Sequence, residues 1–328
     1  MTSIEEVANL IRQHRQFIIT THVTPDGDAI GCELALARFL KGLAKHATII
    51  NHSKTPEQYE FLDAERQILH FNPERDGDAI LQAEVILVLD TNQPDRLRSL
   101  QPFVAQSKAK KIVIDHHLDA HNFADHYLLD DDATSTGEIV YRLLMTLDGP
   151  KFDKAVAEAL YAAIMTDTGS FRYPRTDPEI HNIAGHLIQC GADPTEIFAN
   201  VYESWSLGRM RLLGQALDSM KTAYDGKLAY MVCTQKMFGE TGTTEVETDN
   251  FTTYLMSLKG VVVGIFINEL HNGTKISFRS KGDIPINELA KEFRGGGHKN
   301  AAGARLFNAS LEDTIRGVVE KAAKYVGG

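Results

Sequence analysis

The sequence predicts an α/β protein whose N-terminal part contains a parallel sheet. Short β-rich runs alternate with helical patterns, which is the order expected for a parallel sheet covered by helices. The strand-like runs cover residues 16–22, 47–52, 84–90 and 110–117, and the first internal helical pattern covers 29–46. The runs VILVLD and IVID are apolar at successive positions, as expected for strands that are buried on both faces.

The remaining patterns predict a second, smaller α/β domain after a helical connector. Residues 1–16 have an amphipathic pattern with early acids, which predicts a helix rather than a secretion signal. Further helical patterns cover 135–147, 154–171, 178–192 and 195–218. Strand-like runs at 227–233, 261–270 and 274–281 precede helical patterns at 285–293 and 311–325. We therefore expect a first domain over 1–195, a connector over 196–218 and a second domain over 219–328.

Composition excludes several classes of protein. Of the 328 residues, 43% are hydrophobic and 24% are charged, as in ordinary globular proteins. The sequence contains no run of about 18 apolar residues, so we expect no membrane span and no membrane partner. Cys32, Cys190 and Cys233 are too far apart for a zinc site or a redox dithiol, so we expect reduced thiols and a cytoplasmic protein. The net charge of −10 repels a long phosphate backbone, so we expect any nucleic-acid partner to be short or to be held by a local basic patch.

Acids and histidines follow the predicted strands where ligands of parallel sheets bind. The candidate residues are His22, Asp26, Asp28, Asp90, Asp115, His116, His117 and, after a helical pattern, Asp167. Five converging aspartates would repel one another, and divalent cations remove that repulsion. Imidazole mixed with carboxylate suits Mn²⁺, Fe²⁺, Co²⁺ or Zn²⁺ better than Ca²⁺, and Mg²⁺ usually prefers oxygen ligands, so Mn²⁺ is the first choice. Two such ions can share a carboxylate, activate water and clamp phosphoryl oxygens.

Each piece of this pattern also has a plain structural interpretation. An aspartate after a strand is often the N-cap of the next helix, PDGD alone can be a turn, and DHH alone can be a charged loop. Their joint occurrence at successive strand ends favours the metal site.

A glycine-rich stretch carries a second candidate site. Gly295, Gly296 and Gly297 precede His298, and consecutive glycine N–H groups can form an anion-binding nest. A flexible turn is the alternative for the glycines. Basic residues gather nearby in the sequence, at Arg279, Lys281, Arg294 and Lys299, and they predict either a phosphate-binding wall or a solvated basic face.

The motifs HVTPDGDAIG, LDT, DHH, TDTGSF and GGGHKNAAG, in this order, resemble the DHH phosphoesterase superfamily with its DHH-associated C-terminal domain. The resemblance covers essentially the whole chain. It implies that the domain over 1–195 is the DHH metal-binding domain, that the domain over 219–328 is the DHH-associated domain, and that the active site lies in the cleft between them. Length and the absence of added domains make the chain most similar to the stand-alone bacterial nanoRNase and pAp phosphatase branch.

The resemblance also implies a role for each candidate residue. One metal would be bound by His22, Asp26 and Asp90, and the second by Asp28, Asp90, His116 and Asp167, so that Asp90 bridges. Asp115 would orient the adjacent histidine, and His117 would lie near the substrate phosphate. Arg279, Gly295, Gly296, Gly297 and His298 would bind a substrate phosphate or terminal nucleotide. Cys32 stands where serine or another small residue is expected, and it touches no predicted role.

The expected reaction is metal-dependent hydrolysis of short oligoribonucleotides, of 3′-phosphoadenosine 5′-phosphate (pAp), or of both, with Mn²⁺ and with Mg²⁺ or Co²⁺ as alternatives. Other interpretations are a cyclic or linear dinucleotide phosphodiesterase, a manganese pyrophosphatase, which the GGGH motif disfavours, and a nucleotide sensor without turnover. The complete ligand set argues against the sensor. The resemblance is compatible with a homodimer and does not determine the oligomeric state.

Overall fold

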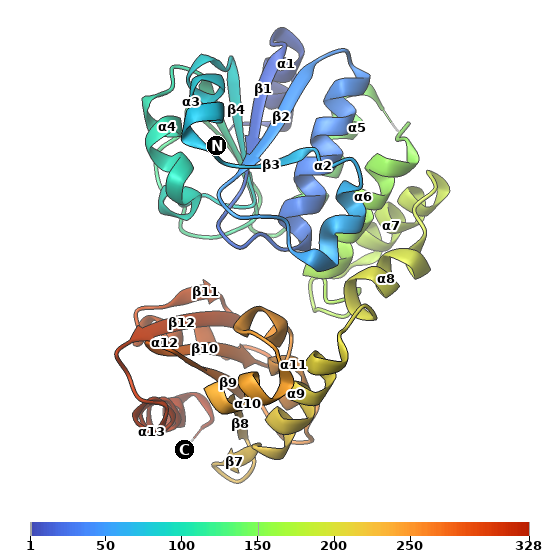
Figure 1. Cartoon of the computed structure of the whole chain (residues 1–328). Helices are drawn as coiled ribbons and strands as arrows, with labels where there is room; N and C mark the ends of the chain where they lie inside the picture. The colour runs from blue at the N-terminus through green and yellow to red at the C-terminus, as the bar shows by residue number, and fades with distance from the viewer. Residues whose placement is uncertain (1, 150, 328) are drawn as a thin grey trace. The chain divides into compact units, whose positions relative to one another are not determined.

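The computed structural model describes residues 2–149 and 151–327 (Figure 1). The chain divides into two compact units, of which the first ends at Ser204 and the second begins at Trp205. The boundary lies between helices α8 (Pro194–Tyr202) and α9 (Leu207–Asp218), both within the stretch that the sequence predicts as helix without strands. Among the described residues, each unit contains one six-stranded sheet.

The first unit contains a wholly parallel sheet with the strand order β3-β2-β1-β4-β5-β6. Its strands are β1 (Gln16–Thr20), β2 (His46–Asn51), β3 (Ile68–His70), β4 (Val85–Leu89), β5 (Lys110–Asp115) and β6 (His126–Leu129). The order reverses between β1 and β4, and the chain leaves these two neighbours toward opposite sides of the sheet. In such sheets the ligand binds at the carboxyl ends beside this reversal.

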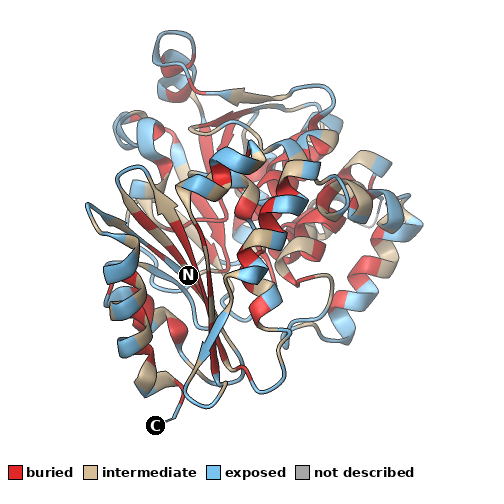
Figure 2. Ribbon diagram, turned by 60° about the horizontal axis from the view of Figure 1, so that its bottom comes forward, coloured by how far each residue is buried: buried red, intermediate tan, exposed pale blue. Residues whose placement is uncertain are grey.

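Both faces of this sheet are covered, which explains the continuous apolar runs. All five residues of β4 are buried. Figure 2 draws the buried residues of the chain in red. Val85, Leu87 and Leu89 pack into one hydrophobic core, whereas Ile86 and Val88 pack into a second core on the other face. The prediction of strands buried on both faces is confirmed.

Helices of the first unit begin with α1 (Ile4–Gln13), where Ser3 and Glu6 form the reciprocal hydrogen bonds of a capping box. The others are α2 (Gly27–Gly42), α3 (Pro73–Gln82), α4 (Gln101–Gln106), α5 (Thr136–Asp148), α6 (Lys154–Asp167), α7 (Pro178–Gln189) and the 3₁₀ helices η1 (Glu57–Asp63) and η2 (Pro94–Leu100). Helix α2 packs extensively on α6, and the small residues Gly31 and Ala163 lie in this contact.

The second unit has a mixed sheet with the order β11-β12-β10-β9-β8-β7. Its strands are β7 (Lys221–Ala223), β8 (Leu228–Cys233), β9 (Val263–Leu270), β10 (Gly273–Ser280), β11 (Gly296–His298) and β12 (Ala301–Phe307). Its helices after α9 are α10 (Gln235–Thr241), η3 (Glu245–Thr248), α11 (Thr252–Leu255), α12 (Ile286–Lys291), α13 (Leu311–Ala322) and η4 (Ala323–Tyr325). Only β8 and β9 pair in parallel, and the other neighbours are antiparallel.

The glycine-rich stretch differs from the sequence prediction of a nest or a flexible turn. Gly296–His298 forms the edge strand β11, which pairs antiparallel with β12. Glycine is required here by close approach, because a Cβ atom on Gly295 would lie 2.1 Å from the carbonyl oxygen of Gly303. Gly295 and Gly297 therefore let two backbones approach closely, whereas a Cβ atom on Gly296 would meet nothing within 4 Å.

The helices are short compared with a bilayer. The longest helix in the described residues, α2, has 16 residues, whereas a membrane-spanning helix needs about 20. Within 2–149 and 151–327, no helix is long and apolar enough to cross a membrane.

Candidate functional site

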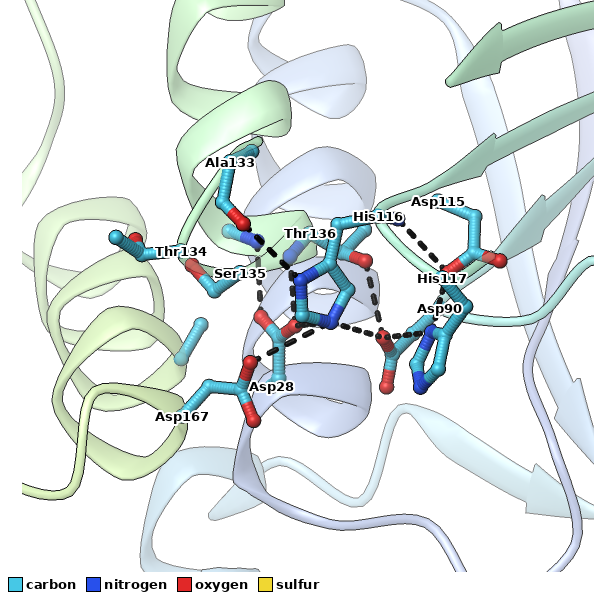
Figure 3. A network of polar contacts seen from close by, with 12 residues as sticks. Asp28, Asp90, Asp115, His116, His117, Ala133, Thr134, Ser135, Thr136 and Asp167 are labelled. Atoms are coloured by element: carbon cyan, nitrogen blue, oxygen red, sulfur yellow. Dashed lines mark hydrogen bonds and ion pairs between the residues drawn. The ribbon is translucent and has the colours of Figure 1, made fainter. Parts of the chain in front are cut away.

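The six predicted metal ligands all lie in the first unit, at the carboxyl ends of its central strands. His22 and Asp26 belong to the loop after β1, Asp28 lies in the first turn of α2, Asp90 follows β4, and His116 follows β5. Asp167 is the last residue of α6. Figure 3 shows the side chains of Asp28, Asp90, His116 and Asp167 pointing toward one another.

His22, Asp26 and Asp90 form the first group, in which one ligand atom from each residue lies within 4.8 Å of the others. His22 Nδ1 lies 2.8 Å from the carbonyl oxygen of Val23, so this nitrogen donates its proton and Nε2 keeps a lone pair. Nε2 lies 3.2 Å from Asp90 Oδ2. A lone pair facing a carboxylate is favourable only with a proton or a cation between them, and a metal ion meets this need.

Asp26 also performs the plain structural role considered for such acids. Its Oδ1 accepts hydrogen bonds from the N–H groups of Asp28 and Ala29, both at 3.1 Å, and thereby caps α2. Both bonds use one oxygen of the carboxylate. Capping and metal binding are therefore compatible at this residue.

Asp28, His116 and Asp167 form the second group, again with ligand atoms within 4.8 Å of one another. His116 Nε2 lies 3.4 Å from Asp167 Oδ2 and 4.0 Å from Asp28 Oδ2. It is also 3.8 Å from Asp90 Oδ1. Asp90 thus faces His22 with one oxygen and His116 with the other, which is the position that a bridging ligand requires.

The backbone of Asp90 is strained. Its φ angle is 57°, in the left-handed region that residues other than glycine seldom adopt. The amide of Asp90 donates to the carbonyl of Ile114 at 3.0 Å, which ties this residue to β5. Strained residues of this kind gather at functional sites, where the surrounding structure compensates their cost.

Electrostatics around the site favour bound cations. Burial, followed by the charges of Asp90, Asp167 and Asp26, holds the pKa of Asp28 well above its usual range. Burial and the charges of Asp26 and Asp90 raise the pKa of Asp167 to about 7. Burial opposes ionisation of Asp90 too, but the hydrogen bond with His22 and the charge of His117 lower its pKa. The metal-free site therefore contains more carboxylate charge than its histidines compensate.

Asp115 is completely buried, and its side chain contacts the ring of His117 rather than the ring of His116. We expected its side chain to orient His116, the adjacent histidine. Asp115 Oδ1 instead accepts from the ring of His117 at 2.7 Å and from the backbone N–H of His116 at 2.9 Å. Although burial acts in the opposite direction, the hydrogen bond to Asp115 and the charge of Asp90 raise the pKa of His117 to about 9.

Sequence reasoning missed the residues that surround these ligands. The amide groups of Thr136 and Gly137 donate to the two oxygens of Asp28, and the hydroxyl of Thr136 donates to Asp90. Cys32 Sγ lies 3.4 Å from Asp28 Oδ1, so the expectation that this cysteine touches no predicted role was wrong. The only sequence signal was the polar Ser-Thr-Gly stretch at the start of a predicted helix.

The predicted phosphate-binding residues lie in the second unit. Arg279 of β10 and His298 of β11 are both paired opposite Ala301 of β12. Directly opposed residues of antiparallel strands point to the same face, so Arg279 and His298 share a face with a small residue between them. The Nε atom of Arg279 is buried and has no hydrogen-bond partner among the described residues. Lys299, in contrast, is paired with the exposed Asp283 at 2.7 Å.

Comparison with known proteins assigns both units. Residues 16–164 match the DHH family, N-terminal domain, and residues 225–327 match the DHHA1 domain. The chain is 30% identical over 304 residues to the bifunctional oligoribonuclease and PAP phosphatase NrnA of Thermus thermophilus. These aligned residues cover 92% of this chain and 87% of that protein. The Bacillus subtilis protein of the same name is 27% identical over 321 residues, with coverage of 97% and 98%.

A solved structure gives the same assignment. The exopolyphosphatase-related protein from Bacteroides fragilis matches with a TM-score of 0.94 at 33% identity, and the match covers 98% of this chain and 96% of that chain. Of the motifs that predicted the family, HVTPDGDAIG, LDT and DHH lie within the first match and GGGHKNAAG lies within the second, whereas TDTGSF, at 166–171, lies just beyond the end of the first match. The chain therefore belongs to the DHH family of phosphoesterases, hydrolases that act on phosphoester bonds, and contains a DHHA1 domain after its DHH domain.

Proposed function

We propose that this protein uses two divalent cations to hydrolyse short oligoribonucleotides and pAp. The observation that carries the proposal is the position of Asp90, whose two oxygens face His22 and His116 from two ligand groups. Relatives from Thermus thermophilus and Bacillus subtilis, named as oligoribonuclease and PAP phosphatase, support the choice of substrates.

The ligand groups divide between the two cations. His22, Asp26 and Asp90 bind one of them, and Asp28, Asp90, His116 and Asp167 bind the other. We propose Mn²⁺, because the donor set mixes imidazole with carboxylate and contains no thiolate. Two such cations supply a water molecule of lowered pKa and positive charge beside the phosphoryl oxygens.

The other residues orient the reacting groups. Asp115 fixes the ring of His117 through Nδ1, and we assign to this histidine a position beside the substrate phosphate, to which a protonated ring donates a hydrogen bond. We assign binding of a substrate phosphate or terminal nucleotide to Arg279, His298 and the glycines Gly295, Gly296 and Gly297. The guanidinium of Arg279 fits this role because planar N–H pairs match phosphate oxygens.

Short substrates follow from the charge distribution. The chain has a net charge of −10, which repels the distal phosphates of a long strand. Proteins that bind long single strands need an extended basic groove with stacking aromatics, and the predicted basic residues form one compact group in the sequence. We further place the enzyme in the cytoplasm, where buried thiols such as Cys32 and Cys233 stay reduced.

A second candidate is hydrolysis of cyclic or linear dinucleotides. The cyclic-di-AMP phosphodiesterase GdpP of Geobacillus thermodenitrificans is 26% identical over 334 residues, although this chain spans only 49% of that protein. The same ligand groups suit a phosphodiester of either kind.

A substrate panel tests the proposal. Purified protein with Mn²⁺ or Mg²⁺ is incubated with pAp, a diribonucleotide, a pentaribonucleotide, a twenty-mer, pGpG, cyclic di-AMP and pyrophosphate. We expect release of AMP from pAp and of mononucleotides from short RNA, with kcat/KM falling toward the twenty-mer. Equal or rising kcat/KM with length would refute the preference for short substrates. Turnover of cyclic di-AMP or pGpG alone would select the second candidate, and binding without turnover would indicate a sensor.

A further inference from the structure

The first turn of α5 contacts two predicted metal ligands that come from different elements, Asp28 of α2 and Asp90 after β4. The backbone N–H group of Thr136 donates to Asp28 Oδ2 at 2.7 Å (Figure 3). The N–H group of Gly137 donates to Asp28 Oδ1 at 2.8 Å. Both donors belong to the first turn of α5, whose amides have no partner within the helix. Asp28 therefore occupies the N-terminus of α5 with both oxygens and keeps further lone pairs for a cation.

Thr136 makes a second contact with a different ligand. Its side-chain Oγ1 donates to Asp90 Oδ1 at 2.9 Å, and Thr136 is completely buried. Asp28 and Asp90 are both acids and repel each other when both are ionised. One residue thus donates hydrogen bonds to both carboxylates, through its backbone to Asp28 and through its side chain to Asp90.

A network of hydrogen bonds and ion pairs, only partly buried, surrounds Thr136. The amide and hydroxyl of Thr134 donate to Glu138 Oε2 at 2.7 and 2.9 Å. Arg142 forms an ion pair with Glu138 and another with Asp130, at 3.0 Å. Ser135 caps α5 by accepting the N–H of Glu138 at 3.1 Å. The position of Thr136 is therefore set by contacts outside the metal ligands.

We propose that Thr136 is a positioning residue that sets the separation of Asp28 and Asp90 and thereby the affinity of the site for its cations. The proposal rests on the metal-dependent function proposed above and deepens it. A purely structural role for the hydroxyl predicts a different result, namely lower stability of the metal-free protein with unchanged metal affinity.

Three variants of the full-length protein test the proposal. Thr136→Val keeps the amide bond to Asp28 and the shape of the side chain but removes the donor to Asp90. Thr136→Ser restores the hydroxyl. Thr146→Val is the matched control, since Thr146 lies on the same helix and its hydroxyl donates to the carbonyl of Arg142 at 2.9 Å. Calorimetric titration with Mn²⁺, the visible absorption spectrum with Co²⁺ and thermal unfolding of the metal-free protein are measured for each.

We expect Thr136→Val to bind Mn²⁺ roughly 10–100-fold more weakly, as is typical when a hydrogen-bond partner of a metal ligand is lost. Its Co²⁺ spectrum should change, whereas Thr136→Ser and Thr146→Val should resemble the wild type in both measurements. Mn²⁺ affinity of Thr136→Val within twofold of the wild type, with only a lower melting temperature, would overturn the proposal.

Failure of the proposed function has a separate signature. A wild type that binds Mn²⁺ but hydrolyses none of the substrate panel would refute the function, and weaker binding by Thr136→Val would still support the positioning role. A wild type that binds no divalent cation would overturn both.

Discussion

His22 Nε2 lies 3.2 Å from Asp90 Oδ2, and the two residues reach this contact from neighbouring strands, β1 and β4. Asp90 also lies 3.8 Å from His116 with its other oxygen. Asp90→Ala should therefore weaken both cation positions together, because each loses a negatively charged ligand. Loss of a hydrogen-bond partner of a metal ligand typically costs up to about 100-fold in activity. Loss of a ligand itself should cost at least as much, so we expect kcat/KM to fall by at least about 100-fold.

Inductively coupled plasma measurement of bound Mn²⁺, together with pAp hydrolysis, checks this prediction. Asp78→Ala removes an exposed acid on α3 and serves as the control. Asp90→Ala protein with normal metal content and near-normal turnover would refute the two-metal assignment.

Gly137 has no room for a side chain. A Cβ atom at this position would lie 2.7 Å from the Cβ of Ala163 and 3.2 Å from Asp28 Oδ1. Gly137→Ala should lower the free energy of unfolding by about 1–3 kcal/mol, the usual cost of overpacking, and should reduce kcat/KM by moving Asp28. Urea unfolding and steady-state kinetics measure both effects.

Gly185→Ala is the matched control for this substitution. Gly185 lies within α7, and an added Cβ atom would meet nothing within 4 Å. Alanine has the higher helix propensity, so this variant should be as stable as the wild type or more stable by up to about 1 kcal/mol. Equal effects of the two substitutions would contradict the crowding argument.

Glu33 makes stability depend on pH. It is completely buried on α2, and burial raises its pKa to about 8, although the hydrogen bond from Asn51 Nδ2 acts in the opposite direction. Between the usual pKa of 4.5 and about 8, the folded protein holds a proton that the unfolded chain releases. Its contribution to stability is thus complete below about 4.5 and is lost as the pH rises to 8, with a slope of about 1.4 kcal/mol per pH unit.

Glu33→Gln removes this titration and keeps the shape and the acceptor for Asn51. The free energy of unfolding of metal-free wild type should fall relative to that of Glu33→Gln as the pH rises from 5 to 8. Urea titrations at several pH values measure the difference. Parallel pH profiles for the two proteins would show that Glu33 is ionised in the fold.

Arg279 and His298 should act on substrate binding. Both point to the same face of the second sheet, opposite Ala301, and neither belongs to the unit that contains the predicted metal ligands. If their contacts are equally strong in the ground and transition states, Arg279→Ala and His298→Ala should raise KM with little change in kcat. A hydrogen bond to a charged group contributes about 1.5–3 kcal/mol, which corresponds to roughly 10–100-fold in KM.

Steady-state kinetics on pAp measures this effect, with the exposed Arg316→Ala on α13 as the control for loss of one positive charge. A fall in kcat at unchanged KM would place Arg279 or His298 among the catalytic residues.

The central strands were predictable because burial on both faces leaves a continuous apolar run, as in β4 and β5. The edge strands β3 and β6 were missed. They have only three and four residues, and most of these are half-buried, so neither an apolar run nor strict alternation marks them. Strand β11 was missed because glycines at 296 and 297 disfavour strands unless a neighbouring backbone requires them.

The candidate ligand residues could be selected from the sequence for a different reason. His22, Asp26, Asp28 and the DHH stretch are unusual residue types at the ends of strands, so their chemistry is visible in the sequence. Thr136 and Gly137 act on Asp28 through backbone N–H groups, which every residue except proline has. No residue type signals such a contact, and the fold alone places it.

The contact between α2 and α6 has a consequence for how the protein matures. These helices contribute Asp28 and Asp167, which stand near the two ends of the first unit's sequence. During synthesis the residues from His22 to His116 emerge well before Asp167, so the set of predicted ligands is complete only after α6 has formed and packed on α2. Cation binding at these predicted ligands would therefore report that α6 has packed on α2.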